Sequence, residues 1–120
     1  MTSSTFDTGQ AAARLVGTLV SWRVIDGRLC RTYRTRGWKS SLMIANAIGH
    51  LAETAWHHPD LLVAYGRVEV RLVDHDAGGI SARDFALAEK IEELVAWRPA
   101  DPLKVAPERF TLLEPDDSAS

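Results

Sequence analysis

The amino-acid sequence predicts a single α+β domain in which helices pack on one face of a four-stranded antiparallel sheet. Three helical patterns and two β-hairpin patterns alternate along the chain, in the order α-β-β-α-β-β-α. Consecutive strands joined by short turns form antiparallel sheets, and helices placed between such hairpins cover one face of the sheet. The 120 residues are enough for one hydrophobic core but not for two independent ones.

Three segments are expected along the chain. Residues 1–8 are rich in Ser and Thr and are predicted to be flexible, whereas residues 9–99 carry all the periodic patterns and form the domain. Residues 100–120 form a Pro/Asp-rich tail that offers few apolar side chains for packing. This tail is therefore predicted to be mostly flexible.

The domain is expected to open with a helix and a hairpin. Residues 9–20 have high helix propensity and place their apolar side chains on one face, although Gly17 weakens the last turn. Asp26-Gly27 then supplies the two positions with positive φ that a two-residue hairpin turn requires. The return strand is expected over residues 28–35.

The longest helix is expected from Trp38 to His57. Its apolar residues recur at helical spacing and form a continuous buried stripe. A polar line lies about 200° around the helix axis from that stripe. The line consists of Asn46, His50, Glu53 and His57. Pro59 is expected to end the helix, because it disfavours the helical conformation of His58 and has no N–H to donate.

The second half of the domain is expected to hold two strands and the last helix. Residues 61–65 and 67–73 read as strands, and the second alternates apolar and charged residues as a half-buried antiparallel strand does. A glycine-containing loop with His75 follows. Ser81 then begins the last helix, with Asp84 three residues later in an aspartate version of the capping box.

Composition and charge exclude several classes of protein. Hydrophobic residues make up 46% of the chain and charged residues 25%, which excludes a wholly disordered protein. A formal net charge of −2 argues against non-specific binding to nucleic acid. Basic residues do cluster locally, either as the solvated side of the first hairpin or as an anion site. They are Arg23, Arg28, Arg31, Arg34 and Arg36.

The sequence also predicts a cytoplasmic protein that does not bind membranes. Cys30 is the only cysteine, so no intrachain disulfide can form, as is usual in a reducing compartment. Residues 1–10 lack the basic and apolar regions of a signal peptide. No apolar run approaches the ~18–20 residues of a membrane-spanning helix.

Four histidines are the candidate chemical groups. They are His50, His57, His58 and His75. His57 and His58 are adjacent at the predicted helix end, where Pro59 turns the second ring away from the first and the helix dipole favours a protonated imidazole. Imidazole is the side chain best suited to moving protons near neutral pH. Taken alone, an adjacent pair of histidines more often has a surface or capping role.

The spacing of these residues resembles a family signature. Glu53-x-x-x-His57-His58-Pro59, followed by Tyr65, His75 and Asp84, is similar to the motif of the pterin-4a-carbinolamine dehydratases. The resemblance extends over about residues 15–98. Further matching features are Trp22 before the first hairpin, His75-x-x-x-Gly79-Ile80-Ser81-x-x-Asp84 and the closing Ala88-x-x-Ile91-Glu92 helix.

The resemblance implies a small α+β domain, assembled as a homodimer or homotetramer, that dehydrates a 4a-hydroxytetrahydropterin to a quinonoid dihydropterin. This is the 4a-hydroxytetrahydrobiopterin dehydratase reaction of pterin recycling, a hydro-lyase reaction that uses no metal or organic cofactor. By position, His57, His58 and His75 would be the catalytic residues, with His57 as the acid and one of the other two as the base. Glu53 and Asp84 would orient these histidines or hold the pterin.

Two features leave the function open. Trp56 stands where many members carry a polar or acidic residue, so it would reshape the pocket rim or contact the pterin. The stretch from Asn46 to His50 resembles a dehydratase-like subgroup of methylotrophic bacteria, for which a methanopterin would be the substrate. Because of Trp56 and the tail, a non-catalytic binding module with an assembly or regulatory role is the alternative to an enzyme.

Structural roles compete with the chemical ones at several residues. Asp84 is also the third residue of the capping box, Glu53 can be merely solvated, and His50 is expected to be structural. A metal site is not expected on these histidines. Residues seven positions apart on a helix, such as His50 and His57, lie about 10.5 Å apart along its axis, too far to share one zinc ion with bonds of ~2.1 Å.

Overall fold

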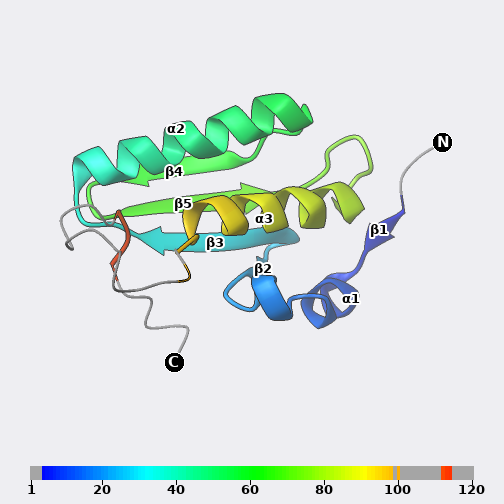
Figure 1. Ribbon diagram of the computed structural model, residues 1–120. Coiled ribbons are helices and arrows are strands. Elements are labelled where there is room, and N and C mark those ends of the chain that lie inside the picture. The colour runs from blue at the N-terminus through cyan, green and yellow to red at the C-terminus, as the bar shows by residue number, and fades with distance from the viewer. Residues whose placement is uncertain (1–3, 99, 101–111, 115–120) are drawn as a thin grey trace.

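The computed structural model describes residues 4–98, 100 and 112–114, and it shows an α+β fold (Figure 1). Strands β2, β3, β5 and β4 form, in this spatial order, a four-stranded antiparallel sheet, and β1 pairs with β6 in a separate antiparallel pair. The predicted α+β class and its four-stranded sheet are therefore confirmed. The elements are β1 (Thr5–Phe6), α1 (Thr8–Ala13), the 3₁₀ helix η1 (Gly17–Leu19), β2 (Arg23–Ile25), β3 (Arg28–Arg34), α2 (Trp38–Ala55), β4 (Asp60–Ala64), β5 (Arg67–Leu72), β6 (Ile80–Ser81) and α3 (Ala82–Val95).

The first hairpin forms at the predicted turn. Asp26 has φ 51° and Gly27 has φ 72°, so both central residues adopt the left-handed conformation. A turn of this kind matches the right-handed twist of the two strands it joins. Ile25 and Arg28 are the pair that closes the hairpin between β2 and β3.

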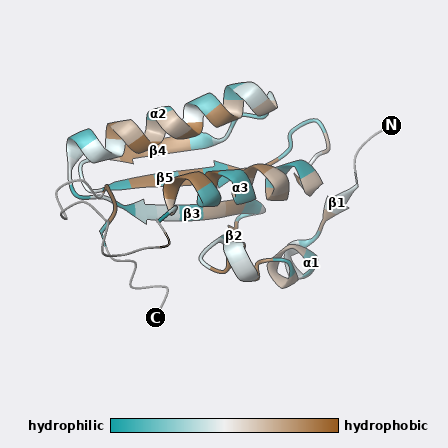
Figure 2. Cartoon of the chain, viewed as in Figure 1, coloured by the Kyte–Doolittle hydropathy of each residue, from teal (hydrophilic) through white to brown (hydrophobic). Residues whose placement is uncertain are grey.

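Helices α2 and α3 lie on the same side of the sheet, and the hydrophobic core fills the space between them and the strands (Figure 1). Apolar stretches of β4 and β5 run beneath these helices in Figure 2. Alternation along the strands turns every second side chain into this core. The buried apolar residues that the sheet and these two helices contribute are Leu29, Tyr33, Ile44, Ile48, Val68, Val70, Leu72, Leu87, Ala88 and Ile91.

Arg31 also lies in this core, although its place in the basic cluster predicts a side chain on the solvated side of the hairpin or in an anion site. Its side chain lies on the same face of β3 as those of Leu29 and Tyr33, and only 6% of Arg31 is exposed. Its Nε is 3.0 Å from a carboxylate oxygen of Glu92 on α3. The prediction is wrong for this residue, because a carboxylate distant in the sequence compensates the buried charge.

Two short strands depart from the predicted order of elements. Residues 1–8 are predicted to be flexible, but Thr5 pairs with Ser81, so that β1 extends along β6. The Phe6 ring lies edge-on to the Phe85 ring of α3, at a centroid distance of 5.4 Å. Two-residue strands carry too little periodicity to be read from a sequence.

The first helix is shorter than predicted. The pattern suggests a helix over residues 9–20, but α1 ends at Ala13 and is followed by η1. The cause lies at Val16, which is extended, and at Gly17, which has φ 59°. Glycine adopts this left-handed conformation without the steric cost that other residues pay.

Helix α2 ends at Ala55, two residues earlier than predicted. Trp56 adopts the left-handed conformation with φ 50°, and its N–H bonds back to the carbonyls of Ala52 and Glu53. The N–H of His57 also donates to the Ala52 carbonyl, at 3.1 Å. This left-handed cap provides hydrogen-bond donors for carbonyls in the last turn of α2. The helix is therefore ended by Trp56, and not by Pro59 as predicted. As a consequence, His57 and His58 follow the helix instead of extending it.

A short part of the tail packs on the domain. Leu113 forms a β-bridge with Thr35 and is 9% exposed, and the N–H of Glu114 donates to the Arg34 carbonyl at 2.9 Å. The rest of the predicted flexible tail, apart from residue 100, lies outside the described residues. None of the helices in residues 4–98 is long and apolar enough to cross a membrane.

Candidate active site

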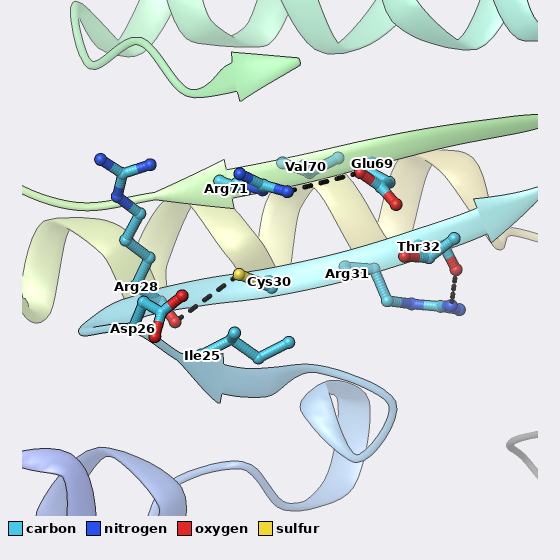
Figure 3. Close-up of a pocket in the computed structure, with 9 residues that line it drawn as sticks. All are labelled: Ile25, Asp26, Arg28, Cys30, Arg31, Thr32, Glu69, Val70 and Arg71. Atoms are coloured by element: carbon cyan, nitrogen blue, oxygen red, sulfur yellow. Dashed lines mark hydrogen bonds and ion pairs between the residues drawn. The ribbon is translucent and has the colours of Figure 1, made fainter. Parts of the chain in front are cut away.

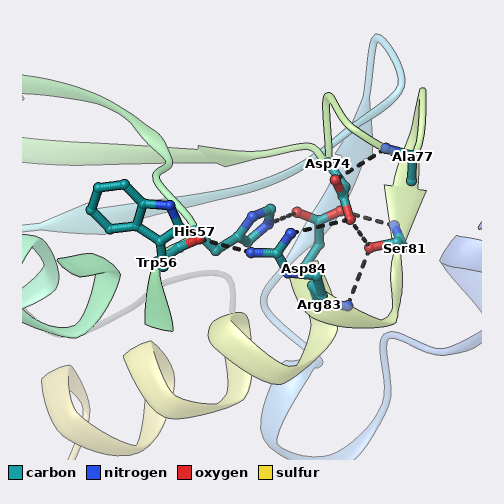
Figure 4. Close-up of polar contacts among 7 residues, drawn as sticks. All are labelled: Trp56, His57, Asp74, Ala77, Ser81, Arg83 and Asp84. Carbon is teal, nitrogen blue, oxygen red and sulfur yellow. Dashed lines mark hydrogen bonds and ion pairs between the residues drawn. The ribbon is translucent and has the colours of Figure 1, made fainter. Parts of the chain in front are cut away.

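A buried histidine–aspartate pair forms the centre of the candidate site (Figure 4). His57 follows the left-handed turn at Trp56, which directs its ring away from α2 and toward the first turn of α3. Its Nε2 lies 2.5 Å from Oδ1 of Asp84. His57 is 7% exposed and Asp84 is fully buried. The contact is therefore a strong hydrogen bond in surroundings that exclude most water.

Asp84 also caps helix α3. Its Oδ2 accepts the N–H of Ser81 at 2.9 Å, in the capping box that the sequence predicts. One carboxylate thus serves the helix with one oxygen and His57 with the other, so the structural and the orienting contact coexist. Burial raises the pKa of Asp84, and the hydrogen bond from Ser81 and the contact with His57 oppose that rise.

His58 forms a second pair, which is open to solvent. Its Nε2 lies 2.6 Å from Oε1 of Glu53, and the two side chains are 47% and 69% exposed. The Trp56 ring stands edge-on to the His58 ring, at a centroid distance of 5.0 Å. The two adjacent imidazoles therefore diverge, one into the protein and one along its surface, each with its own carboxylate.

His57 borders a hollow between α2 and α3. This hollow has a volume of about 450 Å³. Its lining residues are Leu51, Thr54, Ala55, His57, Arg83, Ala86, Leu87 and Lys90. Mostly apolar walls with a few polar groups are typical of sites for small organic molecules.

His75 lies apart from the other candidates. It is exposed on the loop between β5 and β6 and lines a different hollow, of about 580 Å³, together with Thr8 and Arg28. Among the described residues, no hydrogen bond joins the His75 side chain to His57 or His58. The structure thus brings four of the predicted site residues together in two pairs and leaves His75 on a neighbouring loop.

Two further residues connect the site and are absent from the sequence prediction. Arg83 donates from Nη2 to the carbonyl of Trp56 at 2.7 Å, and its Nη1 lies 3.9 Å from Asp74. Asp74 is 2% exposed and accepts the Ser81 hydroxyl at 2.7 Å. Neither residue belongs to a local motif, although the position of Asp74 directly before His75 is a weak signal.

A smaller hollow of about 140 Å³ lies against β3 and β5, beside Arg28, Cys30 and Arg71 (Figure 3). Carboxylates already pair with its arginines, since Arg28 lies 3.6 Å from Asp60 and Arg71 lies 3.6 Å from Glu69. Burial raises the pKa of the Cys30 thiol, which keeps it protonated and unreactive near neutral pH. This hollow holds none of the predicted site residues.

The remaining candidates have simpler surroundings. His50 is exposed on α2, and Trp56 is exposed over 71% of its surface. In the described part of the chain, no three His, Cys, Asp or Glu side chains gather as metal ligands do.

The fold and the site together define a small α+β protein whose candidate active site is a buried histidine–aspartate pair. The sequence profile described as pterin 4 alpha carbinolamine dehydratase matches residues 4–94. The chain therefore belongs to the pterin-4a-carbinolamine dehydratase family, as the resemblance predicts.

Individual relatives agree with this assignment. A protein of Aquifex aeolicus is 44% identical over 77 residues, which cover 64% of this chain and 78% of that protein. A protein of Rubrobacter xylanophilus is 36% identical over 87 residues, which cover 72% and 81%. Both carry the name "Putative pterin-4-alpha-carbinolamine dehydratase".

A solved structure supports the fold. The crystal structure of a transcriptional coactivator/pterin dehydratase from Brucella melitensis is similar, with a TM-score of 0.64. The alignment covers 76% of this chain and 98% of that one, at 24% sequence identity.

Proposed function

We propose that this protein dehydrates a 4a-hydroxytetrahydropterin to a quinonoid dihydropterin. The observation that carries the proposal is the buried pair of His57 and Asp84 at the edge of an apolar hollow. The buried carboxylate holds the imidazole ring in one orientation at the edge of the hollow, and imidazole is the side chain best suited to giving and taking protons near neutral pH. Such a group is suited to protonating a departing hydroxyl.

The proposed reaction needs one acid and one base. The acid protonates the hydroxyl on carbon 4a, and the carbon–oxygen bond breaks to release water. The base removes a proton from a ring nitrogen, and the electron pair left behind forms the new double bond. We assign the acid to His57 and the base to His58 or His75, with Glu53 holding His58 in place.

A pterin-panel assay tests this proposal. The full-length protein is expected to accelerate the decay of 4a-hydroxytetrahydrobiopterin, followed by the absorbance of the quinonoid product. A 4a-hydroxylated methanopterin derivative is the second substrate of the panel, and faster turnover of it would place the protein in the methylotroph-like subgroup. Correctly folded protein that accelerates neither reaction above buffer would contradict the proposal.

A non-catalytic role is the second candidate. It is favoured by large apolar side chains on the surface, since Trp56, Tyr65 and Trp97 are 71%, 73% and 67% exposed. Exposed aromatic residues are common at protein interfaces. An assembly or regulatory factor would bind a specific partner protein and show no dehydratase turnover, so the same assay separates the two roles.

We further propose that the protein acts in the cytoplasm as a homodimer or homotetramer. Three apolar side chains on the surface of α2 support self-association, because Trp38, Leu42 and Met43 are 49%, 40% and 49% exposed. Light scattering coupled to size exclusion is expected to give two or four times the 13.2 kDa of the chain. A mass equal to that of one chain at micromolar concentration would contradict this prediction.

A further inference from the structure

A second buried carboxylate, that of Asp74, is linked to the His57–Asp84 pair by hydrogen bonds through a single residue, Ser81 (Figure 4). The Ser81 hydroxyl donates to Asp74 at 2.7 Å, and the Ser81 N–H donates to Asp84 at 2.9 Å. Asp74 is 2% exposed, and both Ser81 and Asp84 are fully buried. One residue therefore fixes the separation of two carboxylates, and the proposed reaction assigns a role to only one of them.

Asp74 also determines the shape of the loop that carries His75. Its Oδ1 accepts the N–H of Ala77 at 3.2 Å, and its own N–H donates to the Gly79 carbonyl at 3.0 Å. The N–H of Gly78 donates back to the Asp74 carbonyl at 2.9 Å. The loop is thus closed by hydrogen bonds that converge on this one residue.

Arg83 links the same carboxylate to the turn that carries His57. Its guanidinium lies 3.9 Å from Asp74 and donates to the Trp56 carbonyl at 2.7 Å. The Arg83 side chain is 43% exposed, so water weakens its attraction for Asp74. The negative charge of Asp74 is consequently only partly offset at the position of His57.

The charge of Asp74 acts on the pair directly. Hydrogen bonding from Ser81 lowers the pKa of Asp74, and the nearby charges of Arg83 and His57 also favour its ionised form. An ionised carboxylate behind Asp84 opposes a second negative charge there and favours a positive charge on His57. The titratable or charged groups around the pair are Asp74 from the loop, Arg83 and Lys90 from α3, Glu53 from the last turn of α2, and His58, which follows that helix. His75 follows Asp74 in the loop but lines a different hollow.

We propose that Asp74 is a positioning residue for the dehydratase reaction: through Ser81 it holds Asp84 against His57, and its negative charge favours the imidazolium form of His57. This inference rests on the proposed function for its catalytic consequence. The structural link among Asp74, Ser81 and Asp84 does not depend on that function.

The test is Asp74→Asn, which removes the charge and keeps a side chain of the same shape. The titration midpoint of His57, measured by NMR of the imidazole nitrogens, is expected to move to lower pH when one nearby negative charge is lost. The limb of the pH–kcat profile that reports His57 is expected to move to lower pH by the same amount. KM is expected to change little, because Asp74 does not line the hollow beside His57.

Asp76→Asn is the matched control, since Asp76 is exposed in the same loop and the substitution removes the same charge. It is expected to leave both midpoints unchanged because water screens an exposed charge. If Asp74→Asn does not fold, Asp74→Ser removes the charge with a smaller side chain and is expected to produce the same shift.

The two readouts separate this inference from the proposed function. Equal His57 midpoints in the Asp74 and Asp76 variants would overturn the role of Asp74, whatever the activity. A shifted midpoint in a protein whose wild type has no dehydratase activity would support the link to His57 and reject the proposed function.

Discussion

Replacing His57 with Gln is expected to lower kcat for the dehydration of a 4a-hydroxytetrahydropterin by about 10²–10⁴-fold, the usual contribution of a positioned acid or base. The Gln amide reaches about as far as Nε2 of the imidazole and can still donate to Asp84. It therefore keeps the buried carboxylate hydrogen-bonded, but it cannot exchange a proton near neutral pH. Initial rates over a range of substrate concentrations check this prediction.

The matched control is His50→Gln, which makes the same chemical change on the exposed surface of α2. Its rate is expected to equal that of the wild type. If folded His57→Gln protein retained the full wild-type rate while the wild type was active, His57 would not be the acid. The acid role would then pass to His58 or His75.

Periodicity was sufficient to predict the main elements of the fold. The turn at Asp26-Gly27 and the alternation in β5 depend only on neighbouring residues, and the structure contains both. β1 and β6 could not be predicted, because they are held by a partner strand and not by a pattern of their own. The early end of α2 could not be predicted either. It depends on the left-handed conformation of Trp56, which a tryptophan at this position does not signal.

The site was predicted through family resemblance more than through geometry. The motif contains both members of each pair, His57 with Asp84 and His58 with Glu53, but it cannot show which carboxylate meets which histidine. Asp74 becomes visible as a site residue only when the fold brings its loop next to α3. Whether these side chains perform the catalysis stays a prediction until the variants are assayed.

Replacing Glu92 with Ala is expected to cost about 3–5 kcal/mol of unfolding free energy, the usual effect of removing one partner from a buried ion pair. The Glu92 carboxylate accepts hydrogen bonds from three side chains. The donors are Trp22 Nε1 at 2.9 Å, the Tyr33 hydroxyl at 2.7 Å, and the Arg31 guanidinium at 3.0 and 3.3 Å. Glu92 is 8% exposed, and Arg31 is 6% exposed. Truncation would therefore leave a buried guanidinium without this carboxylate, and urea unfolding measures the loss.

Glu89→Ala is the control for this prediction. Glu89 lies one turn earlier on α3 and is exposed, so its loss is expected to change stability by no more than about 0.5 kcal/mol. Burial also raises the pKa of Tyr33 well above its ordinary value, so Tyr33 stays protonated and donates to Glu92 at any pH near neutral. Equal midpoints in urea for the Glu92 and Glu89 variants would show that the buried cluster contributes nothing.

A double variant separates the loss of the Arg31–Glu92 attraction from the cost of burying the Arg31 charge without the Glu92 carboxylate. Arg31→Met combined with Glu92→Leu removes both charges and fills much of the same volume with apolar groups. It is expected to be more stable than Glu92→Ala alone, because no buried guanidinium is left without the Glu92 carboxylate. A double variant less stable than Glu92→Ala would instead mean that the other contacts of Arg31, with the Tyr33 ring and the Thr32 carbonyl, stabilise the core by more than its buried charge costs. In either case, the comparison measures how strongly α3, which carries Asp84 in its first turn, is held against the sheet.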